Sequence, residues 1–97
     1  MYSITIRIPE TKDPAIDAQN LEQHRAWFQK HQGKEFLFTA GFTDARAGII
    51  LTADMPYETL EEVLQEDVYF DDPAATYEVH ELRVSYGAAQ LNSAASS

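Results

Sequence analysis

The sequence predicts one small α+β domain with the order β-α-β-β-α-β, in which two helices cover one face of a four-stranded antiparallel sheet. Three observations lead to this prediction. The chain begins with alternating polar and apolar residues, its middle holds two apolar segments joined by a short polar turn, and one helical pattern precedes that pair while another follows it. With 97 residues, of which 44% are hydrophobic, the chain is long enough for one hydrophobic core and too short for two.

The first strand and the first helix have clear start and stop signals. Apolar residues alternate with polar ones until Pro9 ends the strand. The alternating apolar positions are Tyr2, Ile4, Ile6 and Ile8. Asp13 is placed to cap a helix that Pro14 opens. Gly33 can supply a left-handed residue after a helix end near Gln32.

The middle of the chain predicts a hairpin of two strands. The segments KEFLFTAGF (34–42) and RAGIILTAD (46–54) are separated by TDA, a plausible length for a hairpin connection. Each segment holds three consecutive apolar residues, at 36–38 and 49–51, so its strand is apolar on both faces. We therefore expect both faces of the sheet to be covered.

A second helix and a last strand complete the pattern. The helix is predicted from about Pro56, with Asp54 as its N-cap, to about Asp67. Its inward face carries Leu60, Val63 and Leu64. The last strand is predicted over TYEVHELRVSY, residues 76–86.

The domain is therefore expected to span residues 1–86. Residues 87–97, GAAQLNSAASS, are small and polar, which predicts a flexible or partner-draped tail. Two helices cover only one face of a sheet, and a second copy of the same chain is the simplest apolar cover for the other face. The sequence thus predicts a homodimer that packs sheet against sheet.

Composition and charge narrow the expected partners. The absence of cysteine excludes disulfides, thiolate metal sites and a cysteine nucleophile. The chain starts without a signal-peptide pattern and has no apolar run of ~18 residues, so we expect a cytoplasmic protein.

The net charge of the chain is −9, with ten acidic residues and one arginine in 47–97. Nucleic acid and anionic membranes would repel such a surface, and neither is an expected partner. No motif indicates a cofactor or a phosphate loop.

His24 is a candidate for chemistry because it lies on the apolar stripe of the first helix. Leu21, His24, Phe28 and His31 recur at helical spacing, so His24 is expected to point inward. A core histidine with a purely structural hydrogen bond is the alternative. His31 is nearer the helix end, and we expect it on the surface, where a cation complements the helix dipole. The Cα atoms of the two histidines are roughly 10 Å apart along the helix, too far for both side chains to bind one metal ion.

Asp67 is the matching candidate on the second helix, because it continues the inward stripe of Leu60, Val63 and Leu64. A carboxylate at a helix C-terminus meets the negative end of the dipole and needs a partner. The alternative is a turn residue that accepts bonds from the amides of Tyr69 or Phe70. Both helices lie on one face of the sheet, so His24 and Asp67 could meet. A carboxylate fixes the tautomer of an imidazole and increases its basicity, which suits proton transfer.

Several aromatic residues follow the predicted elements, and most are expected in the core. Phe42 and Tyr69 each lie beside a turn at the end of an element, so they are predicted at the lip of a pocket. His80, in the last strand, could face solvent or a dimer partner, and its position assigns it no role.

The chain resembles the YCII-related family of small proteins. The features that carry the resemblance are His24 in the first helix, the TAG segment at 39–41, Asp44 in the hairpin and EDVYF after the second helix. The similarity covers about residues 1–86. The chain departs from the family pattern at Phe42 and Val68, where the family has proline.

The resemblance implies a ferredoxin-like dimeric α/β barrel with a His-Asp pair at His24 and Asp67. Phe42, Asp44 and Tyr69 would then contact the substrate, and no metal is expected. One family-like enzyme removes chloride from a chlorinated hydroxyhydroquinone, and similar barrels include muconolactone isomerases and cofactor-free monooxygenases.

The function that we expect is proton transfer, as in an elimination or isomerisation, on a small aromatic or lactone-like molecule. The alternatives are a non-catalytic ligand-binding or interaction module, in which His24 is only a polar core contact, and a cofactor-free monooxygenase on the same architecture.

Overall fold

The computed structural model describes residues 1–83 and confirms the ferredoxin-like α+β fold that the sequence predicts. The elements follow the order β1 (Tyr2–Arg7), α1 (Pro14–His31), β2 (Phe36–Gly41), β3 (Ala47–Thr52), α2 (Tyr57–Gln65) and β4 (Thr76–Glu81). The end predicted for the last strand and the predicted tail both lie outside the described residues.

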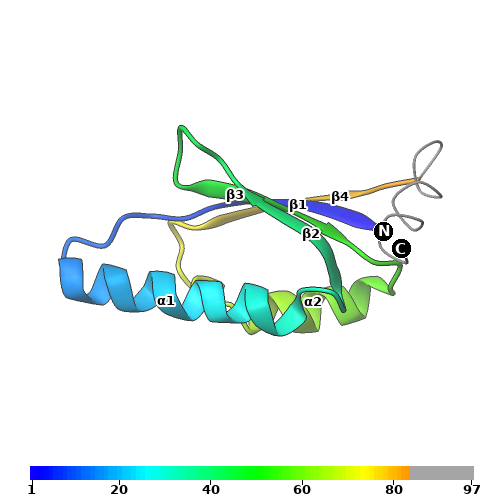
Figure 1. Cartoon of the computed structure of the whole chain (residues 1–97), viewed down its shortest axis with the longest axis horizontal. Helices are drawn as coiled ribbons and strands as arrows, with labels where there is room; N and C mark the ends of the chain where they lie inside the picture. Colours follow the sequence, from blue (N-terminus) through cyan, green and yellow to red (C-terminus); the bar gives the residue numbers. More distant parts are fainter. Residues whose placement is uncertain (84–97) are drawn as a thin grey trace.

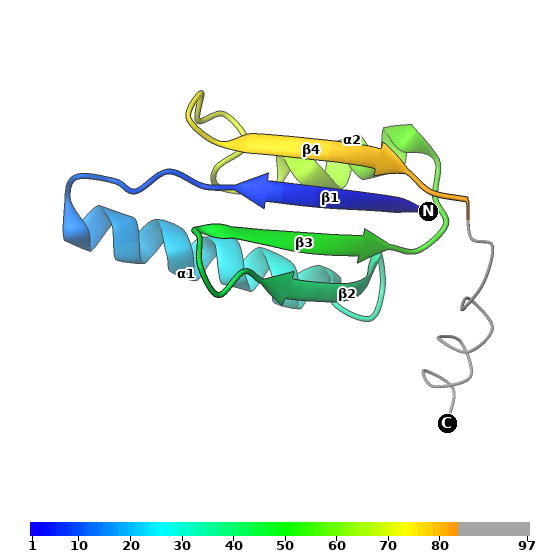
Figure 2. The ribbon, with the colours of Figure 1, turned by 90° about the horizontal axis from the view of Figure 1, so that it is seen from above.

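The four strands form one antiparallel sheet with the order β2-β3-β1-β4. Figure 1 shows α1 and α2 side by side on one face of this sheet, and Figure 2 shows the strand order from above. Within residues 1–83, no helix combines the length and the apolar composition needed to cross a membrane.

Local signals set the ends of α1 as expected. The Asp13 side chain accepts a hydrogen bond from the backbone nitrogen of Ala15 at 2.9 Å, which satisfies one of the free amides at the helix start. Gly33, after the helix, has a φ of 79°, a conformation that glycine adopts without steric cost. These residues are therefore sufficient to explain where the helix begins and ends.

Asp54 does not cap α2. The residue before the first turn is Pro56, which offers no side-chain cap, and the Asp54 carboxylate instead accepts from the Met1 amino group at 2.8 Å. This ion pair lowers the pKa of Asp54. The prediction of an Asp54 cap was wrong because the N-cap position falls on Pro56, and the Asp54 carboxylate pairs with the Met1 amino group.

The core lies between the sheet and the two helices. Its buried apolar side chains are Tyr2, Ile4, Ile6, Trp27, Phe36, Ile50, Leu60, Val63 and Leu64. Trp27 also joins the helices directly, because its Nε1 donates to the backbone carbonyl of Val63 at 2.8 Å. This hydrogen bond links α1 to α2 directly within the core.

His31 is buried, with only 5% of its surface exposed, and not on the surface as predicted. Its Nδ1 pairs with Glu35, and its Nε2 lies 3.3 Å from Glu66. The bond with His31 lowers the pKa of Glu35, and Lys30, followed by His31, lowers the pKa of Glu66. His31 is thus buried because it lies on the apolar stripe of α1. The carboxylates of Glu35 and Glu66 provide hydrogen-bond partners for its two nitrogens.

Within residues 1–83, no element covers the second face of the sheet. The register pairs Phe38 with Leu51, on the face opposite the buried Ile50, and Phe38 is 52% exposed. On the β1 and β4 side of this face the side chains are polar, and Glu78 Oε1 accepts a hydrogen bond from His80 Nε2 at 3.0 Å. His80 is therefore an exposed residue of this outer face.

Gly48 of β3 provides a test of the strand pairing near the hairpin. A Cβ atom at Gly48 would meet the backbone carbonyl oxygen of Ala40 at 2.9 Å, whereas a Cβ at its cross-strand partner Gly41 would meet nothing within 4 Å. We predict that Gly48→Ala lowers the free energy of unfolding by about 1–3 kcal/mol, since backbone atoms must shift. Gly41→Ala should change it by less than about 0.5 kcal/mol. Urea denaturation measures both values, and equal effects would contradict this packing.

Candidate functional site

The structure brings together the two ionisable side chains that the sequence singled out. His24 projects from α1, and Asp67 lies two residues after the end of α2. The His24 Nδ1 and the Asp67 Oδ1 are 2.7 Å apart, and the two residues are 7% and 4% exposed. The pair therefore forms in the space between the helices and the sheet.

Asp67 does not act as a side-chain acceptor for the following turn, which was the alternative. The backbone N–H of Phe70 donates to the backbone carbonyl of Asp67 at 3.0 Å. The backbone N–H of Asp67 donates to the backbone carbonyl of Leu64 at 3.1 Å. The turn is thus closed by main-chain bonds, which leaves both carboxylate oxygens free for other partners.

Tyr77 of β4 supplies the second partner of Asp67. Its hydroxyl donates to Asp67 Oδ2 at 2.6 Å. Burial, and then this bond to Asp67, raise the pKa of Tyr77 well above its ordinary value, so the hydroxyl keeps its proton. When Asp67 is ionised, both of its oxygens only accept, so the His24 nitrogen that faces Oδ1 carries a hydrogen.

This hydrogen bond makes the two nitrogens of His24 chemically different. With the proton on Nδ1, a neutral ring has its free lone pair on Nε2. Within residues 1–83, Nε2 makes no hydrogen bond, and it is not among the side-chain atoms that are sealed from solvent without a partner. Nε2 is therefore accessible and able to accept a proton.

Three aromatic rings hold the His24 ring in this orientation. Phe28 and Tyr69 meet it edge to face, with centroid distances of 4.5 and 5.2 Å, and Trp27 stacks on it at 5.8 Å. The imidazole is thus confined by packing as well as by its bond to Asp67.

Tyr69 contributes as one of these walls and not as a pocket lip. The prediction placed it at the edge of a pocket, but it is only 1% exposed and its hydroxyl has no partner among the described residues. Burial, and then the charge of Asp17, raise the pKa of Tyr69. The ring packs inward, edge to face on His24.

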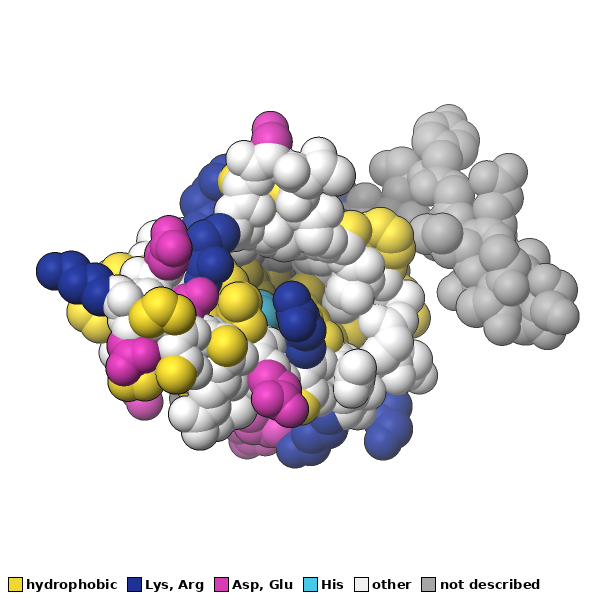
Figure 3. All heavy atoms as spheres, turned by 60° about the vertical axis from the view of Figure 1, so that its left-hand side comes forward, with side chains coloured by type: hydrophobic (Ala, Val, Ile, Leu, Met, Phe, Trp, Pro, Cys, Tyr) yellow, Lys and Arg dark blue, Asp and Glu magenta, His cyan; other side chains and the backbone are white. Residues whose placement is uncertain are grey.

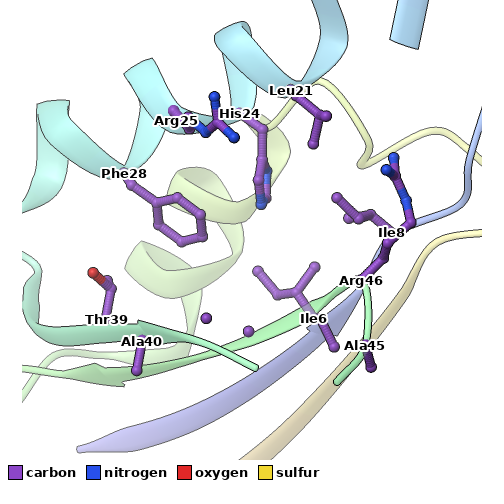
Figure 4. A pocket seen from close by; sticks show the side chains of 13 residues that line it. Ile6, Ile8, Leu21, His24, Arg25, Phe28, Thr39, Ala40, Ala45 and Arg46 are labelled. Carbon is purple, nitrogen blue, oxygen red and sulfur yellow. The ribbon is translucent and has the colours of Figure 1, made fainter. Parts of the chain in front are cut away.

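A cavity of about 450 Å³ opens beside His24. It lies between α1 and the end of the sheet that carries the β2–β3 connection, which rises away from α1 in Figure 1. Figure 3 shows the hollow from outside, with a histidine side chain visible in its depth, and Figure 4 shows the lining side chains. The lining is formed by Ile6, Ile8, Leu21, His24, Arg25, Phe28, Thr39, Ala40, Gly41, Ala45, Arg46, Ala47 and Gly48.

The cavity can hold a small and largely apolar molecule next to one titratable nitrogen. Most lining side chains are aliphatic or aromatic, and small residues form the β2 and β3 wall. Sites of this kind bind small ligands through apolar contact and fix their orientation through a few polar groups. His24, Arg25 and Arg46 are the ionisable groups of the lining.

The two other predicted ligand contacts lie close to the cavity but do not line it. Phe42 is 38% exposed, and the guanidinium carbon of Arg7 lies 5.8 Å from its ring centroid. Asp44 is exposed in the bend between β2 and β3. Their neighbours Gly41 and Ala45 do line the cavity. The loop that the sequence singled out therefore borders the cavity, but through side chains other than Phe42 and Asp44.

Sequence reasoning missed Tyr77, Arg25 and Arg46. Tyr77 could have been found from the two-residue period of β4, which places it on the face opposite Glu78 and His80. Arg25 and Arg46 gave no comparable signal, because an arginine in a helix or a hairpin is ordinarily a solvated residue.

The described residues offer no alternative metal site. Within residues 1–83, no three histidine, aspartate or glutamate side chains lie close enough together to hold a metal ion.

Tyr77 allows the Asp67 network to be tested through stability. We predict that Tyr77→Phe lowers the free energy of unfolding by about 1–3 kcal/mol, because a buried carboxylate oxygen loses its donor. Tyr57→Phe is the matched control, since Tyr57 is 49% exposed and should change the value by less than about 0.5 kcal/mol. Both are measured by urea denaturation. A Tyr77 variant as stable as the control would show that the hydroxyl does not support Asp67.

Comparison with known proteins does not assign the chain to a family. No model of a protein family matches the sequence, and no curated protein matches it. The arrangement of His24, Asp67, Tyr77 and the cavity is therefore the basis for assigning a function.

Proposed function

We propose that this protein catalyses proton transfer on a small aromatic or lactone-like molecule bound in the cavity, as in an isomerisation or elimination. One observation carries the proposal. The Nδ1 of His24 is hydrogen-bonded to the buried Asp67, while Nε2 has no partner among residues 1–83 and lies beside a cavity of about 450 Å³.

His24 acts in this proposal as the general base. Its Nε2 removes a proton from a carbon or hydroxyl of the ligand, and the electron pair that remains is delocalised onto the ligand's carbonyl or ring. The imidazolium formed in this step is stabilised by Asp67, whose Oδ1 is already 2.7 Å away. His24 then returns the proton, either to another carbon, which completes an isomerisation, or to a leaving group, which completes an elimination.

Asp67 and Tyr77 act as positioning residues. Asp67 keeps the hydrogen on Nδ1, and the Tyr77 hydroxyl holds Asp67 through Oδ2 at 2.6 Å. Because the carboxylate is buried and hydrogen-bonded at both oxygens, it does not have to reorganise when the imidazolium forms. The apolar walls of the cavity exclude water from the ligand, which strengthens these electrostatic interactions.

We also propose that the chain belongs with the YCII-related proteins and forms a sheet-against-sheet homodimer. The support for the family is a histidine on the first helix that meets an aspartate after the second. The support for the dimer is the outer face of the sheet, which no element of residues 1–83 covers and where Phe38, paired with Leu51, is 52% exposed. A second copy would cover this apolar strip.

An isomerisation assay tests the function. In α-angelica lactone, removal of a proton next to the carbonyl and its return to the far end of the dienolate give the conjugated lactone. We predict that the protein accelerates this shift above the buffer rate, and that His24→Gln lowers the acceleration by roughly 10²-fold or more, as for loss of a general base. Proton NMR in D₂O follows both the shift and the deuterium that it incorporates.

His80→Gln is the matched control, since His80 lies on β4, at the polar edge of the outer face and away from both the Phe38 strip and the cavity. It should retain the activity of the native protein. A folded His24→Gln variant with native activity would contradict the proposal. Tight lactone binding without exchange would instead indicate a non-catalytic binding module, and oxygen uptake with a quinol would indicate a cofactor-free oxygenase.

A further inference from the structure

The charges that line the cavity differ from those of the rest of the chain. The net charge is −9, with 16 acidic residues against seven basic ones. The lining of the cavity, however, contains Arg25 and Arg46 and no carboxylate. A ligand in the cavity therefore meets positive charge within a molecule that is negative as a whole.

Arg46 is fixed in place at the hairpin end of the cavity. Its Nη2 donates to Asp17 Oδ1 at 2.9 Å and to the backbone carbonyl of Pro9 at 3.0 Å. These bonds tie Arg46 to α1 and to the segment after β1, and Asp17 offsets part of its charge. Arg46 is thus a rigid donor, but it is not a free cation.

Arg25 has no such partner. It follows His24 directly on α1 and lines the same cavity, and within residues 1–83 it makes no hydrogen bond or ion pair. Figure 4 shows Arg25 beside His24 on the helix side and Arg46 on the other side of the cavity. An unpaired guanidinium beside an apolar cavity favours an oxyanion, because its planar N–H groups match a carboxylate with two parallel hydrogen bonds.

We propose that the ligand of this cavity is a small organic acid, with an aromatic or lactone body and a carboxylate that Arg25 binds. This inference rests on the proposed function, because the carboxylate would hold the body of the molecule against Nε2 of His24. Arg46 provides a second N–H donor across the cavity. The carboxylate thus supplies the orientation that the aliphatic walls do not.

Matched pairs of acids and amides test the inference. The probes are benzoate with benzamide, phenylacetate with phenylacetamide, and 2-furoate with 2-furamide, and the side-chain NMR signals of His24 report binding. We expect each acid to bind at least tenfold more tightly than its amide. Arg25→Gln should weaken the acids roughly ten- to hundredfold, as for loss of a charged hydrogen bond, and leave the amides unchanged.

Lys34→Gln is the control for the change in net charge. Lys34 is exposed in the turn after α1, away from the residues that line the cavity, so its loss should leave acid binding unchanged. Arg25 is itself exposed, and Arg25→Gln is expected to fold, which circular dichroism checks.

The outcomes separate this inference from the proposed function. The inference is overturned if the amides bind as tightly as the acids, or if Arg25→Gln does not change the affinity for the acids. In both cases binding beside His24 would still support the proposed function. If neither series shifts the His24 signals, the inference is likewise overturned, and the function then depends on the lactone assay alone.

Discussion

The buried carboxylate of Asp67 is the group on which the site depends. Its side chain is fully enclosed, and a carboxylate in that position is stable only when donors replace the water it has lost. His24 of α1 and Tyr77 of β4 provide those donors, one at each oxygen. Asp67, just beyond α2, thus links α1 to the edge strand β4. The elements that form the fold therefore also determine how His24 is oriented.

The cavity has a comparable structural origin. α1 extends along the sheet for 18 residues, whereas α2 has nine, so part of the space beneath α1 is bounded by the hairpin and not by a second helix. Small residues of β2 and β3 line that side. The close approach of Gly48 to the Ala40 carbonyl shows how tightly the two strands pair there. His24 lies where the packed core meets this open region. Its Nδ1 faces Asp67 in the core, and its Nε2 is on the cavity side.

Regular patterns predicted most of the fold, and they predicted part of the site. The alternation in β1, the Asp13 and Gly33 signals and the stripe on α2 depend on neighbours in the sequence, so element order and the inward direction of Asp67 were accessible. His31 was predicted on the surface because a cation there complements the dipole of α1. Its position on the apolar stripe of the same helix, which indicates burial, was given less weight. The contribution of Tyr77 depends on the pairing of β4 with β1, and that of Arg46 depends on how the hairpin approaches α1. These long-range geometries have no local pattern, which is also why Phe42 and Asp44 were named in place of their neighbours.

The protonation of the two nitrogens of His24 tests the central claim most directly. Nitrogen-15 correlation spectra of the native protein, recorded at a pH where the ring is neutral, distinguish a protonated from a bare ring nitrogen. The hydrogen bond to Asp67 predicts a proton on Nδ1 and a bare Nε2. A ring that carries its proton on Nε2, or that averages between the two forms as a free imidazole does, would contradict the claim that Asp67 orients His24 toward the cavity.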